Sequence, residues 1–168
     1  ICLQRFSVRE GDLLFGESLN SSVRFLENGL TFEADILAGQ KTGFYFDQRE
    51  NRETIRELAL GKTTLNVFCY TGGFSIYALA GKCKSVLEID LNPWALESGR
   101  KNVELNFSDP KTVANFFQKK GDAFQELEKL KKKRQEFDLA ILDPPAFARK
   151  KKEKPTALKA YFRLAEMG

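Results

Sequence analysis

Three segments carry residues that suit binding of a nucleoside-like ligand, and each follows an apolar run. The first contains Thr71-Gly72-Gly73, whose glycines permit close backbone approach and whose amides, at a helix start, can hold a carboxylate or phosphate. The second ends in Asp90, roughly 20 residues further on, where a carboxylate can accept both hydroxyls of a ribose. The third begins a helix at Asp122, which either accepts from an adenine amine or caps the helix. Their order predicts one nucleoside cofactor.

The glycine turn also discriminates between cofactors. An NAD site uses Gly-x-Gly-x-x-Gly to cradle a pyrophosphate, and the segment 68–74 lacks that pattern. S-adenosylmethionine has no phosphate and consists of an amino-acid end, a sulfonium, a ribose and an adenine. The short turn and the two acids therefore favour S-adenosylmethionine as the cofactor.

A fourth apolar run leads into Asp143-Pro144-Pro145-Ala146-Phe147. The two prolines fix the backbone and remove amide donors, which leaves the Asp143 side chain and nearby carbonyls to meet a ligand. Such a rigid, acceptor-rich edge suits a planar base, with Phe147 stacking on its face. The alternative is a turn at a helix start with a buried phenylalanine.

These segments need a parallel sheet to bring them together. Apolar runs predict strands at 64–70, 85–90, 112–117 and 137–142, and helical spacing predicts helices at 74–80, 92–106, 122–134 and 159–167. Repeated strand–helix units indicate an α/β fold with helices on both faces of the sheet. The ligand then lies beyond the carboxyl ends of the strands. Because no fifth strand follows 159–167, the sheet is expected to be incomplete at its C-terminus.

The first part of the chain has a different pattern. Alternating residues at 5–9, 22–26 and 31–36 predict short strands, and Asn28-Gly29 predicts a hairpin turn between the last two. A helix is expected over 48–60. We therefore predict a hairpin-rich N-terminal element at 1–47 and a cofactor-binding domain at 48–168.

Composition narrows the chemistry further. The chain has 168 residues, a formal net charge of +4 and no histidine, which excludes Ser-His and Cys-His catalysis. Its three cysteines form no Cys-x-x-Cys pair, so neither a zinc site nor a disulfide framework is indicated. No apolar run approaches the roughly 20 residues that cross a bilayer, and no secretory signal is recognisable. We expect a cytoplasmic protein without a metal or a membrane partner; the oligomeric state stays open.

Four segments together resemble a known family. They are 40–52 (QKTGFYFDQRENR), 66–74 (NVFCYTGGF), 102–106 (NVELN) and 137–147, which ends in DPPAF. The chain is similar over residues 22–168 to the class I S-adenosylmethionine-dependent methyltransferases that modify cytosine C5 in large-subunit ribosomal RNA. The guanine-N7 methyltransferase half of a fused ribosomal RNA enzyme is a close relative. The resemblance implies a Rossmann-like sheet, preceded by a small β-rich element.

The resemblance also assigns roles to residues. Asp143, Pro144 and Pro145 are expected to be catalytic, and Asn66 stands where many class I enzymes have an acid. The segment around Asp47 is expected to close over the cofactor. The expected cofactor-binding residues are Gln48, Arg49, Phe68, Cys69, Tyr70, Thr71, Gly72, Gly73, Asp90, Leu91, Asp122 and Ala123.

The implied substrate is RNA, specifically 23S ribosomal RNA. Basic residues outnumber acidic ones between 129 and 154, and lysines next to the base-binding turn can meet phosphates. The predicted RNA-binding residues are Lys41, Phe147, Arg149, Lys150, Lys151 and Lys152. A small-molecule methyltransferase and a non-catalytic RNA-binding module are the alternatives.

The methylated atom stays open between two choices. Cytosine C5 needs a thiolate that adds at C6. In the resembling enzymes that thiol follows the fourth strand in a later motif, and Cys2, Cys69 and Cys83 are poor substitutes for it. Guanine N7 has a lone pair and requires only alignment with the donor.

Overall fold

The computed structural model describes Phe15, 22–37, Gly39, 43–148 and 150–168. Its main sheet is parallel, with strands in the order β5-β4-β3-β6. The strands are β3 (Thr63–Val67), β4 (Ser85–Asp90), β5 (Phe116–Lys120) and β6 (Leu139–Leu142). The predicted α/β fold is therefore confirmed, and the sheet places the carboxyl ends of its strands at one edge.

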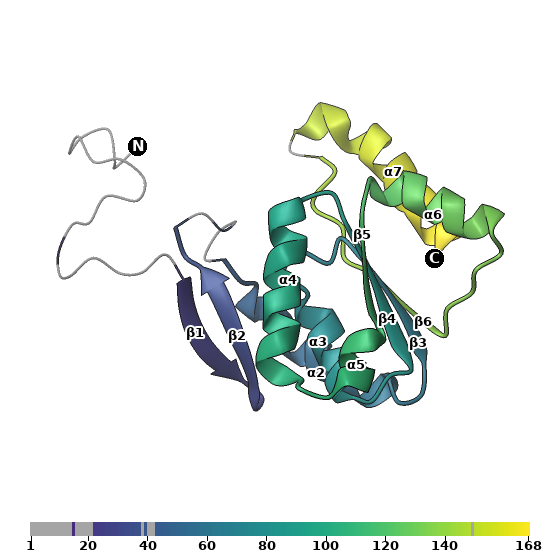
Figure 1. Cartoon of the computed structure of the whole chain (residues 1–168). Coiled ribbons are helices and arrows are strands. Elements are labelled where there is room, and N and C mark those ends of the chain that lie inside the picture. The colour runs from purple at the N-terminus through teal and green to yellow at the C-terminus, as the bar shows by residue number, and fades with distance from the viewer. Residues whose placement is uncertain (1–14, 16–21, 38, 40–42, 149) are drawn as a thin grey trace.

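Helices cover both faces of this sheet (Figure 1). The α3–α4 face is packed with Ile76, Tyr77, Val86 and Val103, whereas Leu65, Ile89, Leu127 and Leu164 pack under α6 and α7. The helices are α2 (Arg49–Leu58), α3 (Gly73–Ala80), α4 (Pro93–Asn106), α5 (Pro110–Ala114), α6 (Ala123–Lys132) and α7 (Lys154–Met167), with short 3₁₀ turns η1 (Phe46–Gln48) and η2 (Lys151–Glu153). No helix within the described ranges combines the length and the apolar character that a membrane span requires.

The hairpin predicted around Asn28-Gly29 is confirmed. Strands β1 (Ser22–Glu27) and β2 (Leu30–Asp35) pair antiparallel, and both turn residues have positive φ, 49° and 81°. Such a turn matches the twist of the two strands. The strand expected at 5–9 lies outside the described residues.

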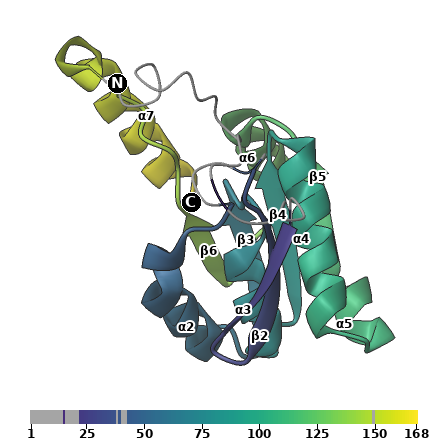
Figure 2. The ribbon, with the colours of Figure 1, turned by 90° about the vertical axis from the view of Figure 1, so that its left-hand side faces the viewer.

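Two asparagines of α4 attach the hairpin to the domain. Asn106 Oδ1 accepts from Thr31 N at 2.8 Å and Asn102 Oδ1 accepts from Glu33 N at 2.7 Å, so side chains one turn apart satisfy the open edge of β2. Figure 2 shows β2 in front of the main sheet, between α2 and α4. The hairpin thus shares a core with the sheet domain, and the domain division at residue 47 stays a prediction.

The strand predicted at 112–117 is wrong at its start. Residues 110–114 form α5 instead, and the strand begins at Phe116. Asp109 caps this helix, because its carboxylate accepts from Thr112 N at 2.9 Å, and Pro110 occupies the first turn. A local cap outweighs the β-branched residues Thr112 and Val113. The last helix likewise begins earlier than expected, at Lys154.

Candidate active site

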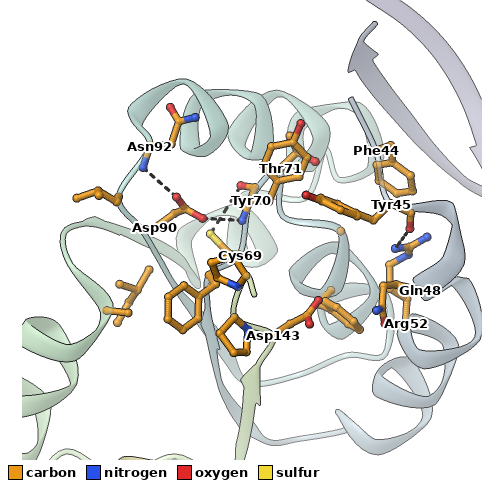
Figure 3. Close-up of a pocket in the computed structure, with 18 of the residues that line it drawn as sticks. Phe44, Tyr45, Gln48, Arg52, Cys69, Tyr70, Thr71, Asp90, Asn92 and Asp143 are labelled. Atoms are coloured by element: carbon orange, nitrogen blue, oxygen red, sulfur yellow. Dashed lines mark hydrogen bonds between the residues drawn. The ribbon is translucent and has the colours of Figure 1, made fainter. Parts of the chain in front are cut away.

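A cavity of about 710 Å³ opens at the carboxyl ends of β3, β4, β5 and β6. Figure 3 shows its labelled residues around the cavity, contributed by the strand ends, by the turn after β3, and by α2 with the segment before it. Thirteen predicted residues line it: Gln48, Phe68, Cys69, Tyr70, Thr71, Gly73, Asp90, Leu91, Asp122, Ala123, Asp143, Pro144 and Pro145. The structure therefore brings most of the predicted site together in one place.

The turn between β3 and α3 is tightly wound. Phe68, Tyr70 and Gly72 all have positive φ, and Phe68 N donates to Ile89 O at 2.9 Å, which holds the turn against β4. A Cβ at Gly72 would lie 2.6 Å from Glu88 Oε1, so only glycine fits there. Gly72 does not line the cavity. It precedes α3 without a capping side chain, and Gly73 and Phe74 at the helix start face the cavity.

Asp90 is held in a fixed orientation by the backbone. Its Oδ2 accepts from Tyr70 N and its Oδ1 accepts from Asn92 N, each at 2.9 Å (Figure 3). Each carboxylate oxygen can accept a further hydrogen bond. The side chain lines the cavity and is thus prepared to receive two hydroxyl groups.

Asp122 and Asp143 come from the next two strand ends. Asp122 caps α6 through Oδ1, which accepts from Gln125 N at 3.0 Å, so the capping interpretation holds while the residue also lines the cavity. Asp143 follows β6 and precedes the two prolines, and it also lines the cavity. Desolvation raises the pKa of Asp143, and the negative charge of Asp47 raises it further.

Helix α2 contributes a buried cation to the cavity wall, Arg52, which was not among the predicted site residues. Arg52 is 2% exposed; its Nε and Nη2 each donate to the Glu27 carboxylate at 2.7 Å, and Nη1 donates to Tyr45 O at 2.9 Å. The guanidinium also lies 4.5 Å from the centre of the Phe44 ring. Arg52 ends the segment 40–52 that carries the family resemblance, but nothing in the sequence separates it from the other charged residues of α2. The other lining residues outside the predicted set are Phe44, Tyr45, Asp47, Phe74, Ile89, Asn92 and Gly121.

Several predicted site residues lie away from the cavity. Arg49 donates to Asn28 Oδ1 of the hairpin turn, at 2.9 and 3.0 Å. Phe147 is partly buried and packs against Phe68, Phe124 and Tyr161. Lys150, Lys151 and Lys152 are exposed at the start of η2, whereas Lys41 and Arg149 lie outside the described residues.

Asn66, which stands where many class I enzymes have an acid, does not line the cavity. It is 1% exposed, and its Nδ2 donates to Ser75 Oγ at 2.9 Å beneath the turn. Asn66 therefore supports α3 from within the core and does not line the cavity.

The described cysteines are poor nucleophiles. Burial raises the pKa of Cys69 well above its ordinary value, and the nearby Glu88 and Asp90 carboxylates raise it further. Burial also raises the pKa of Cys83 to about 11. Both side chains therefore stay protonated at neutral pH, and a protonated thiol is a poor nucleophile because the thiolate is the reactive form.

The chemistry of the cavity fits S-adenosylmethionine. Fixed Asp90 oxygens match a ribose, the uncapped start of α3 matches a carboxylate, and apolar walls from Phe68 and Ile89 match an adenine ring. Within the described ranges, no group of three or more His, Cys, Asp or Glu side chains is arranged to hold a metal ion.

Comparisons with known proteins agree with this chemistry. Residues 5–164 match the family model of S-adenosylmethionine-dependent methyltransferases. The chain is 42% identical over 161 residues to a ribosomal RNA large subunit methyltransferase of Deinococcus radiodurans, covering 96% of this chain and 39% of that protein. It is 41% identical to the ribosomal RNA large subunit methyltransferase I of Aeromonas salmonicida, covering 89% of this chain and 37% of that protein.

A solved methyltransferase structure is similar to this chain as well. The methyltransferase SMU.776, complexed with SAH, superposes with a TM-score of 0.74 at 32% identity, covering 82% of this chain and 36% of that chain. The present chain thus spans less than two fifths of the curated relatives it matches. It belongs to the S-adenosylmethionine-dependent methyltransferase family, and S-adenosylmethionine is its cofactor.

Proposed function

We propose that this protein transfers the methyl group of S-adenosylmethionine to a base of large-subunit ribosomal RNA. The observation that carries the proposal is the meeting of the glycine turn, Asp90, Asp122 and the Asp143-Pro144-Pro145 segment around one cavity. The named activity of the ribosomal RNA methyltransferases at about 40% identity supports RNA as the substrate. The exposed lysines of η2, close to the Pro145 end of the cavity in sequence, suit contacts with phosphates.

The proposed arrangement assigns one part of the cofactor to each segment. Asp90 accepts hydrogen bonds from the ribose hydroxyls, and the second oxygen of Asp122 accepts a hydrogen bond from the adenine amine. The amides at the start of α3 bind the carboxylate of the amino-acid end. The cofactor supplies the electrophilic methyl group, and these residues fix its orientation for attack.

Asp143 is proposed to hold the target base. Its carboxyl has a raised pKa and lines the cavity before two residues that donate no backbone hydrogen bond. It therefore meets the polar rim of the base as an acceptor, or as a donor when protonated. The RNA around the target base is proposed to contact the predicted RNA-binding residues, namely Phe147, Lys41, Arg149, Lys150, Lys151 and Lys152.

Cytosine C5 is the proposed target atom. Its methylation requires a thiolate, and the raised pKa values of Cys69 and Cys83 do not support either as the source. Under this proposal the thiol comes from a segment beyond the 168 residues. The same observation favours guanine N7 as a second candidate, because attack by N7 needs no thiol.

Replacing Asp90 with alanine is expected to weaken binding of S-adenosylhomocysteine by about tenfold to hundredfold, since hydrogen bonds to a charged group are lost. Isothermal titration calorimetry on the full-length protein measures the change. Asp109→Ala is the matched control, because Asp109 also accepts backbone hydrogen bonds but lies at α5. Equal affinity of the Asp90 variant and the wild type would remove Asp90 from the cofactor site.

Methyl transfer to ribosomal RNA is expected to fall at least tenfold in Asp143→Ala, while S-adenosylhomocysteine still binds, because the target base loses its polar contact. Incorporation of tritiated methyl groups into protein-free 23S ribosomal RNA measures it, and nuclease digestion identifies the methylated base. An RNA substrate also requires activity that drops steeply with salt. Salt-independent activity on free nucleosides would instead indicate a small-molecule enzyme, and no transfer at all would indicate a binding module.

A further inference from the structure

A second, smaller cavity lies between the hairpin and the start of α2. Its volume is about 280 Å³, and the residues that line it are Phe25, Leu26, Glu27, Asn28, Phe46 and Arg49. None of these six residues lines the larger cavity at the strand ends. The smaller cavity is therefore separate from the residues that are proposed to hold the cofactor.

The two cavities share a wall. Phe46 and Arg49 line the smaller cavity, whereas the two residues between them, 47–48, line the larger one. Glu27 of the smaller cavity also accepts two hydrogen bonds, each at 2.7 Å, from Arg52 of the larger cavity. A polymer that places one unit in the larger cavity can therefore place a neighbouring unit in the smaller one.

The smaller cavity has an unmatched positive charge. Its carboxylate, Glu27, is 5% exposed and is paired with Arg52. Arg49 is exposed, and its Nε and Nη2 donate to Asn28 Oδ1 at 3.0 and 2.9 Å, which orients the guanidinium. Within the described part of the chain, no carboxylate forms an ion pair with Arg49. The cavity therefore attracts an anionic group.

An exposed aromatic ring lies beside this charge. The ring centre of Phe46 is 5.1 Å from that of Phe25 and 5.3 Å from that of Phe44, so two neighbouring rings hold it in place. Phe46 is nevertheless 54% exposed, and Leu26 is 74% exposed. Aromatic rings and planar guanidinium groups are the surfaces on which unpaired RNA bases stack, and arginine also binds phosphate.

We propose that the smaller cavity binds one unpaired nucleotide of the RNA, adjacent in the strand to the target nucleotide, with its base on Phe46 and its phosphate on Arg49. The inference rests on the proposed function, in which a base of the RNA enters the larger cavity. The volume of the smaller cavity suits a single planar base. Stacking and a phosphate contact orient the strand without reading its sequence.

Variants of the ring and of the cation test the two contacts separately. Filter binding of the full-length protein to protein-free 23S ribosomal RNA gives the Kd at several salt concentrations. Phe46→Leu keeps apolar bulk but loses the ring, so the Kd is expected to rise by about fivefold to tenfold. Phe46→Tyr keeps the ring and should bind the RNA as the wild type does.

Arg49→Gln tests the phosphate contact through its dependence on salt. The Kd for the RNA is expected to rise by about fivefold at low salt, because one cation is lost. The slope of log Kd against log salt concentration is expected to fall by about 0.7, the value for one phosphate contact with a single strand. A residue that only supported the hairpin would leave this slope unchanged.

Phe117→Leu and Lys101→Gln are the matched controls. Phe117 of β5 is 52% exposed, nearly as much as Phe46, and Lys101 is an exposed cation of α4. Neither residue lines either cavity, so both variants are expected to bind the RNA as the wild type does. Calorimetry with S-adenosylhomocysteine, expected within twofold of the wild type for every variant, shows that each is folded.

The outcomes distinguish this inference from the function on which it rests. Unchanged RNA affinity in Phe46→Leu and Arg49→Gln, with normal methyl transfer by the wild type, would overturn the inference alone. A change in their molar mass by light scattering, with unchanged RNA affinity, would instead assign the cavity to a contact between copies of the chain. Equal weakening in the controls would also overturn it. A wild type that binds S-adenosylhomocysteine but methylates no RNA would refute the proposed function.

Discussion

Arg52→Met is expected to lower the free energy of unfolding by about 3–5 kcal/mol. The substitution removes both hydrogen bonds to Glu27 and leaves a carboxylate that is 5% exposed without its counter-charge. It also removes the bond to Tyr45 O and the contact with the Phe44 ring, which hold one wall of the cavity. Urea denaturation followed by circular dichroism measures the loss.

Two further variants separate this effect from a general sensitivity of α2. Arg56→Met removes a cation whose pair with Glu53 is 3.7 Å long and more than one third exposed, so a loss below about 1 kcal/mol is expected. The double variant Arg52→Met with Glu27→Gln is expected to recover part of the stability, because it leaves no unpaired buried charge. Equal losses of unfolding free energy in Arg52→Met and Arg56→Met would show that the buried pair stabilises the protein no more than the exposed pair.

The buried pair also connects two functional parts of the molecule. Glu27 ends β1 of the hairpin and additionally accepts from Tyr77 Oη of α3 at 3.0 Å, while Arg52 lines the cavity. One side-chain cluster therefore joins the hairpin, the helix after the glycine turn and the cavity wall. A displacement of the hairpin is therefore expected to change the shape of the cofactor site, because these side chains join the two.

The parts of the site that the sequence predicted are those encoded locally. The glycine turn, Asp90 and Asp122 follow directly from strand ends, and parallel topology brings strand ends together whatever the rest of the chain does. The predicted strand at 112–117 failed for a local reason as well, since the Asp109-Pro110 helix start was not recognised.

Long-range contacts explain what the sequence did not reveal. Arg52 lines the cavity only because it meets Glu27, which is 25 positions away and lies on a different element. Arg49, one turn earlier on the same helix, meets Asn28 instead. Neither periodicity nor residue type distinguishes these two arginines, because their partners are set by how the hairpin packs on the domain.

Glu88 gives the second large effect, a dependence of stability on pH. Its side chain extends from β4, is fully buried against Gly72 and against Gly99 of α4, and one oxygen, Oε1, has no hydrogen-bond partner among the described residues. The pKa of Glu88 is raised from 4.5 to about 7, chiefly by burial; the negative charge of Asp90 contributes to the rise, and hydrogen bonds with the Ser75, Gln118 and Cys69 side chains partly offset it.

The sign of the effect follows from proton binding. Between pH 4.5 and pH 7 the folded protein keeps a proton on Glu88 that the unfolded chain has released, so this contribution to stability is complete below pH 4.5 and is lost as the pH rises through about 7. The loss is roughly 3 kcal/mol, as an order of magnitude for a shift of this size. In Glu88→Gln the side chain is a neutral amide that does not ionise, so the variant is expected to be more stable than the wild type at pH 8.

Urea denaturation at pH 5, 6, 7 and 8 measures the difference between Glu88→Gln and the wild type. This difference should grow in favour of the variant across that range, because the wild type alone loses the contribution of Glu88. Glu97→Gln on the exposed side of α4 is the control, and its curve should parallel that of the wild type. A constant difference between Glu88→Gln and the wild type would mean that Glu88 does not hold its proton in the folded state. In that case a buried negative charge would lie directly beneath the glycine turn at neutral pH.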